Sequence, residues 1–128
     1  MKINITAGEC LNNLLKIKYP DEIFIPFNEA MNKGKYSSKL FSSDFIKERC
    51  LTHNVSEKEY KEKLSGFLKL LENLDDYAEI FLWFGEDDFC KENQKVVIKC
   101  LQEHNFSGKI ILNVVEETTG KIIDSRIF

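Results

Sequence analysis

Short apolar runs alternate along this chain with longer segments whose apolar residues recur every three or four positions. A short apolar run bounded by turn residues predicts a strand, and the longer spacing predicts a helix with one buried face. The predicted strands are Lys2 to Thr6, Ile23 to Ile25, Ala78 to Phe84, Lys109 to Val115 and Ile122 to Phe128. The pattern therefore predicts strands that are separated by helices over most of the chain.

The helical pattern is clearest in the first half of the chain and after Gly85. Leu11, Leu14 and Leu15 predict a first helix that ends before Pro20, and Ser42 to Asp44 offer starts for a second, short helix. The segment between them, from Asn28 to Ser38, is polar and reads as a loop. Apolar residues at helical spacing after Gly85 predict a further amphipathic helix.

A capping box marks the start of the longest predicted helix. Ser56 and Glu59 have the spacing of this motif, and the apolar stripe that follows runs from Tyr60 to Leu74. We therefore predict one helix of about five turns in this segment.

Strands that alternate with helices favour a mainly parallel sheet covered by helices on both faces. The short turn from Thr118 to Lys121 favours an antiparallel hairpin at one edge. We predict one α/β domain over residues 1–128, a three-layer sandwich of Rossmann-like or flavodoxin-like type.

Composition narrows the possible partners. The chain has 128 residues, a formal net charge of −3 and scattered basic residues, which argues against a nucleic-acid partner. No apolar run approaches the length needed to cross a membrane and no signal peptide is evident, so we expect a cytoplasmic protein with reduced thiols. The four cysteines lack zinc-ligand spacing, so we expect no structural zinc.

Three predicted loops follow strand ends that should meet at one edge of the sheet. They are Thr6 to Cys10, Pro26 to Glu29 and Trp83 to Asp88. Ligands of open α/β sheets bind beyond the carboxyl ends of the strands. We therefore predict an acidic crevice across which Glu9, Glu29 and Asp87 face one another.

Several of these residues also have a purely structural interpretation. Glu86, Asp87 and Asp88 could cap a helix, or they could bind a hydroxyl, an amine or Mg²⁺. Trp83 could be a core residue or could stack on a ligand ring. Cys10 could be a reactive thiol at a helix start, although an inert buried thiol is the simpler expectation.

For the first loop the structural interpretation is a capping box between Thr6 and Glu9. The two histidines, His53 and His104, lie at predicted helix ends, where a cationic ring stabilises the helix. No nucleotide-binding fingerprint, nucleophile elbow or paired-histidine zinc motif occurs, so the sequence leaves open whether the chain is an enzyme.

Four separated motifs resemble a bacterial family known as domain-of-unknown-function family 1835. Its leucine-tryptophan-phenylalanine-glycine strand end, followed by acidic residues and a phenylalanine-cysteine pair, is similar to Leu82 to Asn93. Its first loop is similar to Ile5 to Glu9, its second to Pro26 to Glu29 with Gly34, and one of its helices to Phe45 to Arg49. The resemblance spans about the whole chain.

The chain departs from the family pattern at three places. Glu9 replaces an aspartate, Lys91 and Glu92 replace a glutamine-containing pair, and the Gly-Pro pair after the second motif is absent. The resemblance implies an α/β fold and no known activity, and family members often carry a second small C-terminal domain.

We predict a domain that binds a small polar or metal-bridged ligand in this crevice. Arg49 would supply a fork for a carboxylate or phosphate, and the acidic residues would take hydroxyls or Mg²⁺, although no cofactor is required by the sequence. The predicted site residues are Thr6, Gly8, Glu9, Asn28, Glu29, Arg49, Trp83, Gly85, Glu86, Asp87 and Asn93. The alternatives are a regulatory protein-interaction module without a small-molecule ligand, and a hydrolase with Glu86 or Asp87 as general base.

Overall fold

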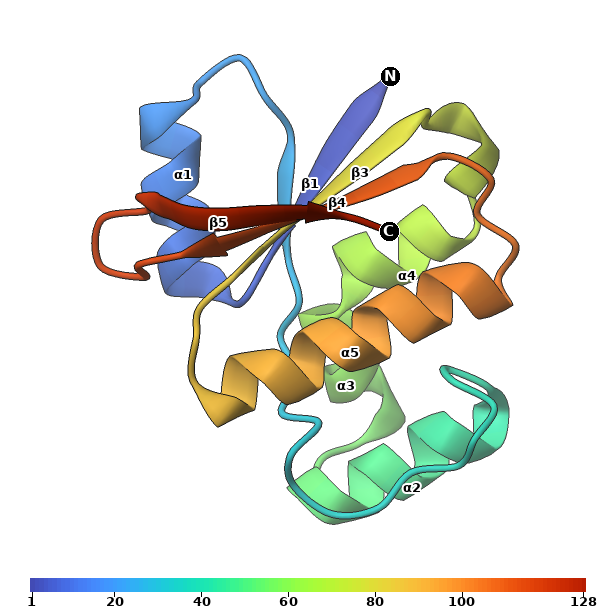
Figure 1. Cartoon of the computed structure of the whole chain (residues 1–128). Helices are drawn as coiled ribbons and strands as arrows, with labels where there is room; N and C mark the ends of the chain where they lie inside the picture. Colours follow the sequence, from blue (N-terminus) through green and yellow to red (C-terminus); the bar gives the residue numbers. More distant parts are fainter.

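The computed structural model describes all 128 residues and contains one mixed sheet. Its strands lie in the order β2-β1-β3-β4-β5, with β5 antiparallel to β4 and all other neighbours parallel (Figure 1). They are β1 (Lys2–Thr6), β2 (Phe24–Pro26), β3 (Glu79–Phe84), β4 (Lys109–Val115) and β5 (Ile122–Ile127). The α/β class, the mainly parallel sheet and the antiparallel edge are confirmed, and the strand order is the flavodoxin-type order.

Helices cover both faces of this sheet. They are α1 (Glu9–Lys18), α2 (Ser43–His53), α3 (Glu57–Lys63), α4 (Ser65–Leu71), the 3-10 helix η1 (Leu74–Asp76) and α5 (Asp88–Glu103). Figure 1 shows α1 on one face and α4 with α5 on the other, while α2 and α3 lie together beyond the carboxyl end of β2. None of these helices is both long and apolar enough to cross a membrane.

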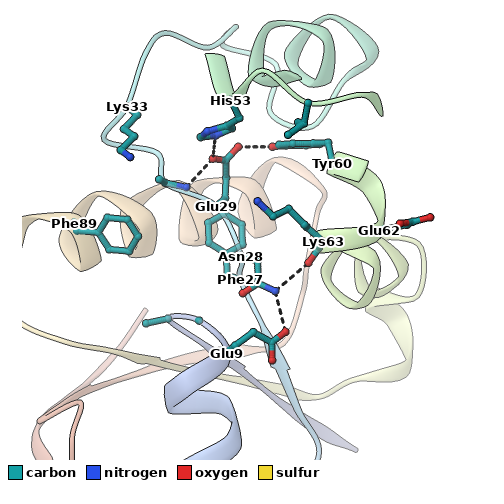
Figure 2. A pocket seen from close by; sticks show the side chains of 14 residues that line it. Glu9, Phe27, Asn28, Glu29, Lys33, His53, Tyr60, Glu62, Lys63 and Phe89 are labelled. Carbon is teal, nitrogen blue, oxygen red and sulfur yellow. Dashed lines mark hydrogen bonds and ion pairs between the residues drawn. The ribbon is translucent and has the colours of Figure 1, made fainter. Parts of the chain in front are cut away.

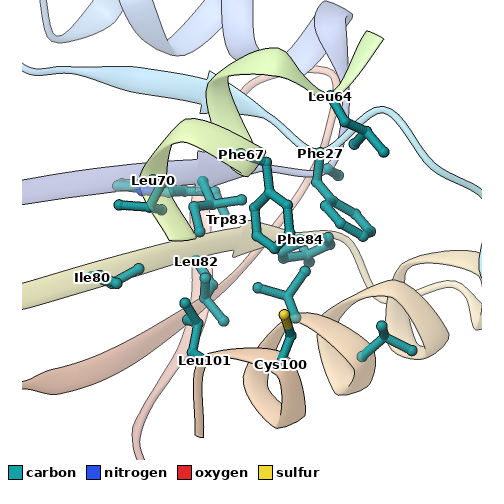
Figure 3. Close-up of a cluster of buried hydrophobic side chains, with 14 of the residues drawn as sticks. Phe27, Leu64, Phe67, Leu70, Ile80, Leu82, Trp83, Phe84, Cys100 and Leu101 are labelled. Carbon is teal, nitrogen blue, oxygen red and sulfur yellow. The ribbon is translucent and has the colours of Figure 1, made fainter. Parts of the chain in front are cut away.

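The residues of β3 alternate between the two faces because successive side chains of a strand point in opposite directions. Leu82 and Phe84 pack with Phe67 of α4 and Leu101 of α5 (Figure 3). Trp83 points to the α1 face, where its indole Nε1 donates to Asn4 Oδ1 over 2.9 Å. The central strand β3 therefore buries both of its faces, as its apolar run predicts.

Three helix starts have side-chain caps at predicted positions. Ser42 caps α2, Ser56 and Glu59 form the predicted capping box of α3, and Asp87 accepts from the Cys90 amide to cap α5. The start of α1 differs, because its N-cap residue is Gly8 and no side chain caps it. The capping box predicted between Thr6 and Glu9 is therefore wrong: Thr6 Oγ1 lies 2.9 Å from Asn12 Oδ1 instead.

The long helix predicted from the Tyr60–Leu74 stripe is also wrong in one respect. The helix breaks at Leu64, with φ −109° and ψ 15°, so that α3 and α4 are separate and η1 follows. Ser65 and Gly66 come directly after the break, and such pairs are a common cause of helix kinks. Gly66 also lets α4 approach β2, since a Cβ there would lie 3.3 Å from Ile25 Cγ2.

Candidate functional site

The carboxylate of Glu29 lies at the centre of a buried hydrogen-bond network beyond the carboxyl end of β2. Arg49 donates to both of its oxygens, Nε to Oε2 over 2.9 Å and Nη2 to Oε1 over 3.0 Å. The Tyr60 hydroxyl donates to Oε2 over 2.5 Å, and the Ala30 amide donates to Oε1 over 2.7 Å. His53 Nε2 lies 2.5 Å from Oε1. The carboxylate is therefore saturated with partners and has no free oxygen for a metal or a ligand.

Arg49 is fully buried and holds the loop between β2 and α2. Besides Glu29 it donates to three backbone carbonyls, those of Ala30, Lys33 and Lys35. The N–H donors of its guanidinium group are thus occupied within the chain. The prediction that Arg49 binds a ligand carboxylate or phosphate is wrong. The physical reason is that a buried guanidinium needs a fixed counter-charge, which Glu29 supplies.

Asn93 of α5 ties the same loop to the core from the other side. Its Nδ2 donates to the Glu29 carbonyl over 2.7 Å, and its Oδ1 accepts from the Met31 amide over 2.9 Å. The side chain is completely buried, so it positions the backbone around Glu29 and is not open to a ligand. Arg49 and Asn93 together fix the direction of the Glu29 side chain.

This network sets the charge states of its members. Burial raises the pKa of Glu29, but the hydrogen bonds from Arg49, Tyr60 and Ala30 and the Arg49 charge outweigh it, so the pKa is held at about 2. Burial and the adjacent Glu29 carboxylate raise the pKa of the Tyr60 hydroxyl far above its usual range. At neutral pH Glu29 is ionised and Tyr60 is a neutral donor.

His53 is the member of the network that reaches the surface, with 22% of its side chain exposed. Its Nε2 contacts both the ionised Glu29 carboxylate and the Arg49 guanidinium, whose Nη2 lies 3.1 Å away. The other ring nitrogen, Nδ1, has no hydrogen-bond partner within the chain. Glu29 therefore holds a histidine whose second nitrogen is free for an outside group.

A cavity of about 690 Å³ lies in front of this histidine. It is formed by the ends of β1 and β2, the start of α1, the loop before α2, α3 and the first turn of α5. Its lining residues are Ala7, Gly8, Glu9, Phe27, Asn28, Glu29, Ala30, Lys33, His53, Val55, Tyr60, Glu62, Lys63 and Phe89. The volume suits a small molecule, and we refer to it as the β1–β2 pocket.

The charged side chains of the β1–β2 pocket are of both signs. Figure 2 shows the Lys63 side chain reaching toward Glu29 and Asn28, whereas Glu62 points away from them. Asn28 Nδ2 donates to Glu9 Oε1 over 3.1 Å and to the Lys63 carbonyl over 3.1 Å. The predicted acidic crevice is therefore a pocket of mixed charge.

Besides Arg49 and Asn93, five of the predicted site residues do not line this pocket. Thr6 and Trp83 are buried toward α1, where Trp83 packs against Tyr19 and Phe24. Gly85 packs against Glu117, since a Cβ there would lie 2.9 Å from the Glu117 Cδ atom.

Glu86 and Asp87, which directly precede α5, are exposed and do not line the pocket. Glu86 lines a separate hollow with Asp124 and Arg126. The Asp87 carboxylate caps α5, so Glu9 and Glu29 share the pocket while Asp87 does not. The prediction of three carboxylates around one hollow is wrong, because the loop after β3 turns toward β4.

Asp87 belongs instead to a small cluster with Cys90 and Glu117, whose ligand atoms all lie within 4.8 Å of one another. Burial, together with the nearby carboxylates, raises the pKa of the Cys90 thiol to about 12. The thiol is therefore protonated at neutral pH and donates to Glu117 Oε1 over 3.3 Å. A hard cation such as Mg²⁺ prefers oxygen ligands, and this cluster offers it only two carboxylates.

Sequence reasoning missed His53, Tyr60, Lys33 and Lys63. A signal for His53 was present, because it lies one turn after Arg49 on α2 and so shares its face. Tyr60 reads as an ordinary core residue of an amphipathic helix, and its hydroxyl contact cannot be found from spacing. The expectation of a buried Cys10 thiol is also wrong, since Cys10 is exposed on the first turn of α1.

In comparisons with known proteins, no family model, no curated protein and no solved structure matches this chain.

Proposed function

We propose that this chain binds a small polar molecule with an anionic group, a phosphate or a carboxylate, in the β1–β2 pocket. One observation carries the proposal: His53, held by the buried Glu29 carboxylate, lines a cavity of about 690 Å³ together with Lys33 and Lys63. Cationic and hydrogen-bonding groups that converge on one cavity are the usual mark of an anion site.

The charge balance supports an anionic ligand. Glu29 is neutralised by Arg49, and the Glu62 side chain, although it lines the pocket, is directed away from Glu29 and Asn28 (Figure 2). The groups left to meet a ligand are Lys33, Lys63 and His53 against the carboxylates of Glu9 and Glu62. The start of α1 adds to this, because its first amides have no side-chain cap and carry the positive end of the helix dipole.

The cost of the network supports a binding role. A buried ion pair such as Glu29–Arg49 often contributes no more stability than apolar residues of similar size. Apolar residues could not hold His53 at the pocket wall. We therefore infer that the network is present to position His53. Glu9 would accept from hydroxyl or amine groups of the ligand, and Phe89 and Val55 would contact its apolar part.

Thermal melting tests this proposal with inorganic phosphate, ribose 5-phosphate, adenosine monophosphate and citrate as probes. A ligand at about 100 times its Kd adds about 2.7 kcal/mol of stability, so we expect at least one probe to raise the Tm. The variant K33M/K63M should lose this shift, because both lysines are exposed and their replacement leaves the core intact.

Lys61 provides the matched control. It lies on α3 beside Lys63, is exposed and does not line the pocket, so K61M should keep the wild-type shift. Equal shifts in K33M/K63M and K61M would contradict the proposal, and so would the absence of a shift with every probe.

A second candidate function, proton transfer by His53, is favoured by its contact with Glu29. A carboxylate that fixes the tautomer of a histidine leaves the other nitrogen as a general base. With a compound that binds in the melting test, H53Q should weaken binding and should lose any turnover even at a saturating concentration of the compound. Turnover by wild type that H53Q retains would remove His53 from the reaction.

Four sequence predictions stay open beside this proposal. They are membership in domain-of-unknown-function family 1835, a cytoplasmic location, Mg²⁺ as a bridge to the ligand, and the alternative of a protein-interaction module. The melting test separates the last of these from ligand binding, because a module without a small-molecule ligand gives no shift with any probe.

A further inference from the structure

The outer edge of β5 has no partner strand. All six residues of β5 are exposed, including Ile127 with 72% of its surface open. The Phe128 amide donates to the Ile110 carbonyl, so the backbone groups of Phe128 face β4. The backbone N–H and C=O groups of successive residues in an antiparallel strand point to opposite sides. Those of Arg126 and Asp124 therefore also face β4, and those of Ser125 and Ile127 point outward.

We propose that β5 is a homodimerisation edge, at which the β5 strands of two copies pair antiparallel around a twofold axis at Ser125. The pairing would join two five-stranded sheets into one continuous sheet. This proposal does not rest on the ligand proposal, because the pocket lies beyond the ends of β1 and β2, and β2 is the edge strand opposite β5.

Charge selects this register from its neighbours. With Ser125 on the axis, Asp124 of each copy lies opposite Arg126 of the other. If the axis is moved to Asp124, the Asp124 side chains of the two copies lie opposite each other. If it is moved to Arg126, the two Arg126 side chains lie opposite each other. Directly opposed like charges destabilise a strand pair and opposite charges stabilise it. Only the register centred on Ser125 forms two ion pairs while using the outward amides.

The same sequence argues for a second copy over other occupants. Edge strands often avoid pairing through charged side chains, most often lysine, and like charges repel when two such strands meet. Here opposite charges flank the axis symmetrically, and Asp124 and Arg126 already lie 3.1 Å apart within one chain. Next to these charges, Ile123 of one copy lies opposite Ile127 of the other. Both side chains are exposed in the single chain, so pairing would cover apolar surface on each copy.

The size of the contact predicts a weak dimer. A stable interface buries about 800 Å² on each partner, which five paired residues of one strand do not reach. The β-bulge beside Val114 and Val115 further limits the regular part of β5. We therefore expect dimers at high micromolar to millimolar concentration and monomers below it.

Sedimentation equilibrium tests the proposal. The weight-average mass of the wild-type chain should rise from 14.9 kDa toward twice that value as the concentration is raised. R126D should remain monomeric throughout, because each copy then presents two carboxylates to the other. The swapped variant D124R/R126D should dimerise again, because the ion pairs are restored with their signs exchanged.

Two controls keep these results interpretable. Circular dichroism should give similar melting curves for all three proteins, since both residues are more than half exposed. K33M/K63M, altered only in the pocket, should dimerise as wild type does.

A wild-type chain that stays at 14.9 kDa at every concentration would overturn the proposal. An R126D variant that dimerises like wild type, or a folded D124R/R126D variant that does not, would also overturn it.

Discussion

The charge on Glu29 is maintained against burial by its hydrogen-bond donors and by Arg49. Its pKa in the folded chain, about 2, is lower than its ordinary value of 4.5. A carboxyl with a lowered folded pKa stabilises the fold above its unfolded pKa, and this contribution is lost as the pH falls through the folded pKa. We therefore expect the free energy of unfolding to fall steeply between pH 4.5 and about 2.

Urea denaturation at several pH values checks this expectation. E29Q should be less stable at pH 7 by about 3–5 kcal/mol, because it leaves the Arg49 charge buried without a counter-charge. It should also have a shallower loss of stability in acid. E62Q is the matched control, since Glu62 is an exposed carboxylate at the same pocket. Equal acid dependence in E29Q and E62Q would contradict the proposed state of Glu29.

The Tyr60 hydroxyl offers a second substitution in the same network. Y60F removes one donor to the ionised Glu29 carboxylate and should cost about 1.5–3 kcal/mol, the usual contribution of a hydrogen bond to a charged group. Tyr19 packs its ring on Phe24 and Trp83 and its hydroxyl has no partner in the chain, so Y19F should be close to neutral. Chemical denaturation of both variants compares the two hydroxyls directly.

The sequence predicted part of this residue-level chemistry. Glu29, Arg49 and Asn93 were all singled out, yet as separate ligand contacts and not as a network. Spacing places residues on elements, but it does not say which distant elements bring their polar groups together. The contact between Glu29 and His53 depends on how α2 sits beyond β2, which no local pattern encodes.

At the level of the elements, two substitutions test whether the acidic residues at the start of α5 cap the helix. D87A removes the side-chain acceptor of the Cys90 amide and should cost about 0.5–2 kcal/mol. D88A removes only a carboxylate near the helix dipole and should cost about 0.3–1 kcal/mol. Thermal unfolding measures both, and a D87A variant that loses no stability would contradict the capping role.

The loop between β2 and α2 requires a glycine at position 34. Gly34 has φ +69°, and a Cβ there would lie 2.6 Å from Thr52 Cγ2. G34A should therefore lose at least about 1–3 kcal/mol of stability. Gly8 is a suitable control, because its φ of 168° is open to any residue and a Cβ there would meet no atom within 4 Å. G8A should cost less than G34A, about 1 kcal/mol or less, because alanine is only a poorer N-cap than glycine there, and urea denaturation measures both.

Most elements could be predicted because their causes are local. The Ser56–Glu59 capping box, the apolar run of β3 and the turn before β5 each specify their structure within a few residues. The break at Leu64 was missed because the apolar stripe continues across it. Ser65 and Gly66 were the available signal, and the packing of Gly66 on Ile25 could not be foreseen without the fold.

In the whole molecule, the strand order explains why the predicted site divided in two. The loops after β1 and β2 lie side by side and form the β1–β2 pocket with α3. The loop after β3 contributes Phe89 to this pocket, but it turns its acidic residues toward β4 and Glu117. The sequence predicted that ligand groups would gather at strand ends, and the direction in which each loop turns was not readable from it.

Chemical-shift mapping by NMR during titration with ribose 5-phosphate locates the ligand on the molecule. We expect the amide signals of Gly8, Asn28, His53 and Lys63 to move together with one saturation curve, and those of Asp87 and Glu117 to stay in place. Signals that move only around Asp87, Cys90 and Glu117, or nowhere at the highest concentration, would contradict the β1–β2 pocket as the binding site.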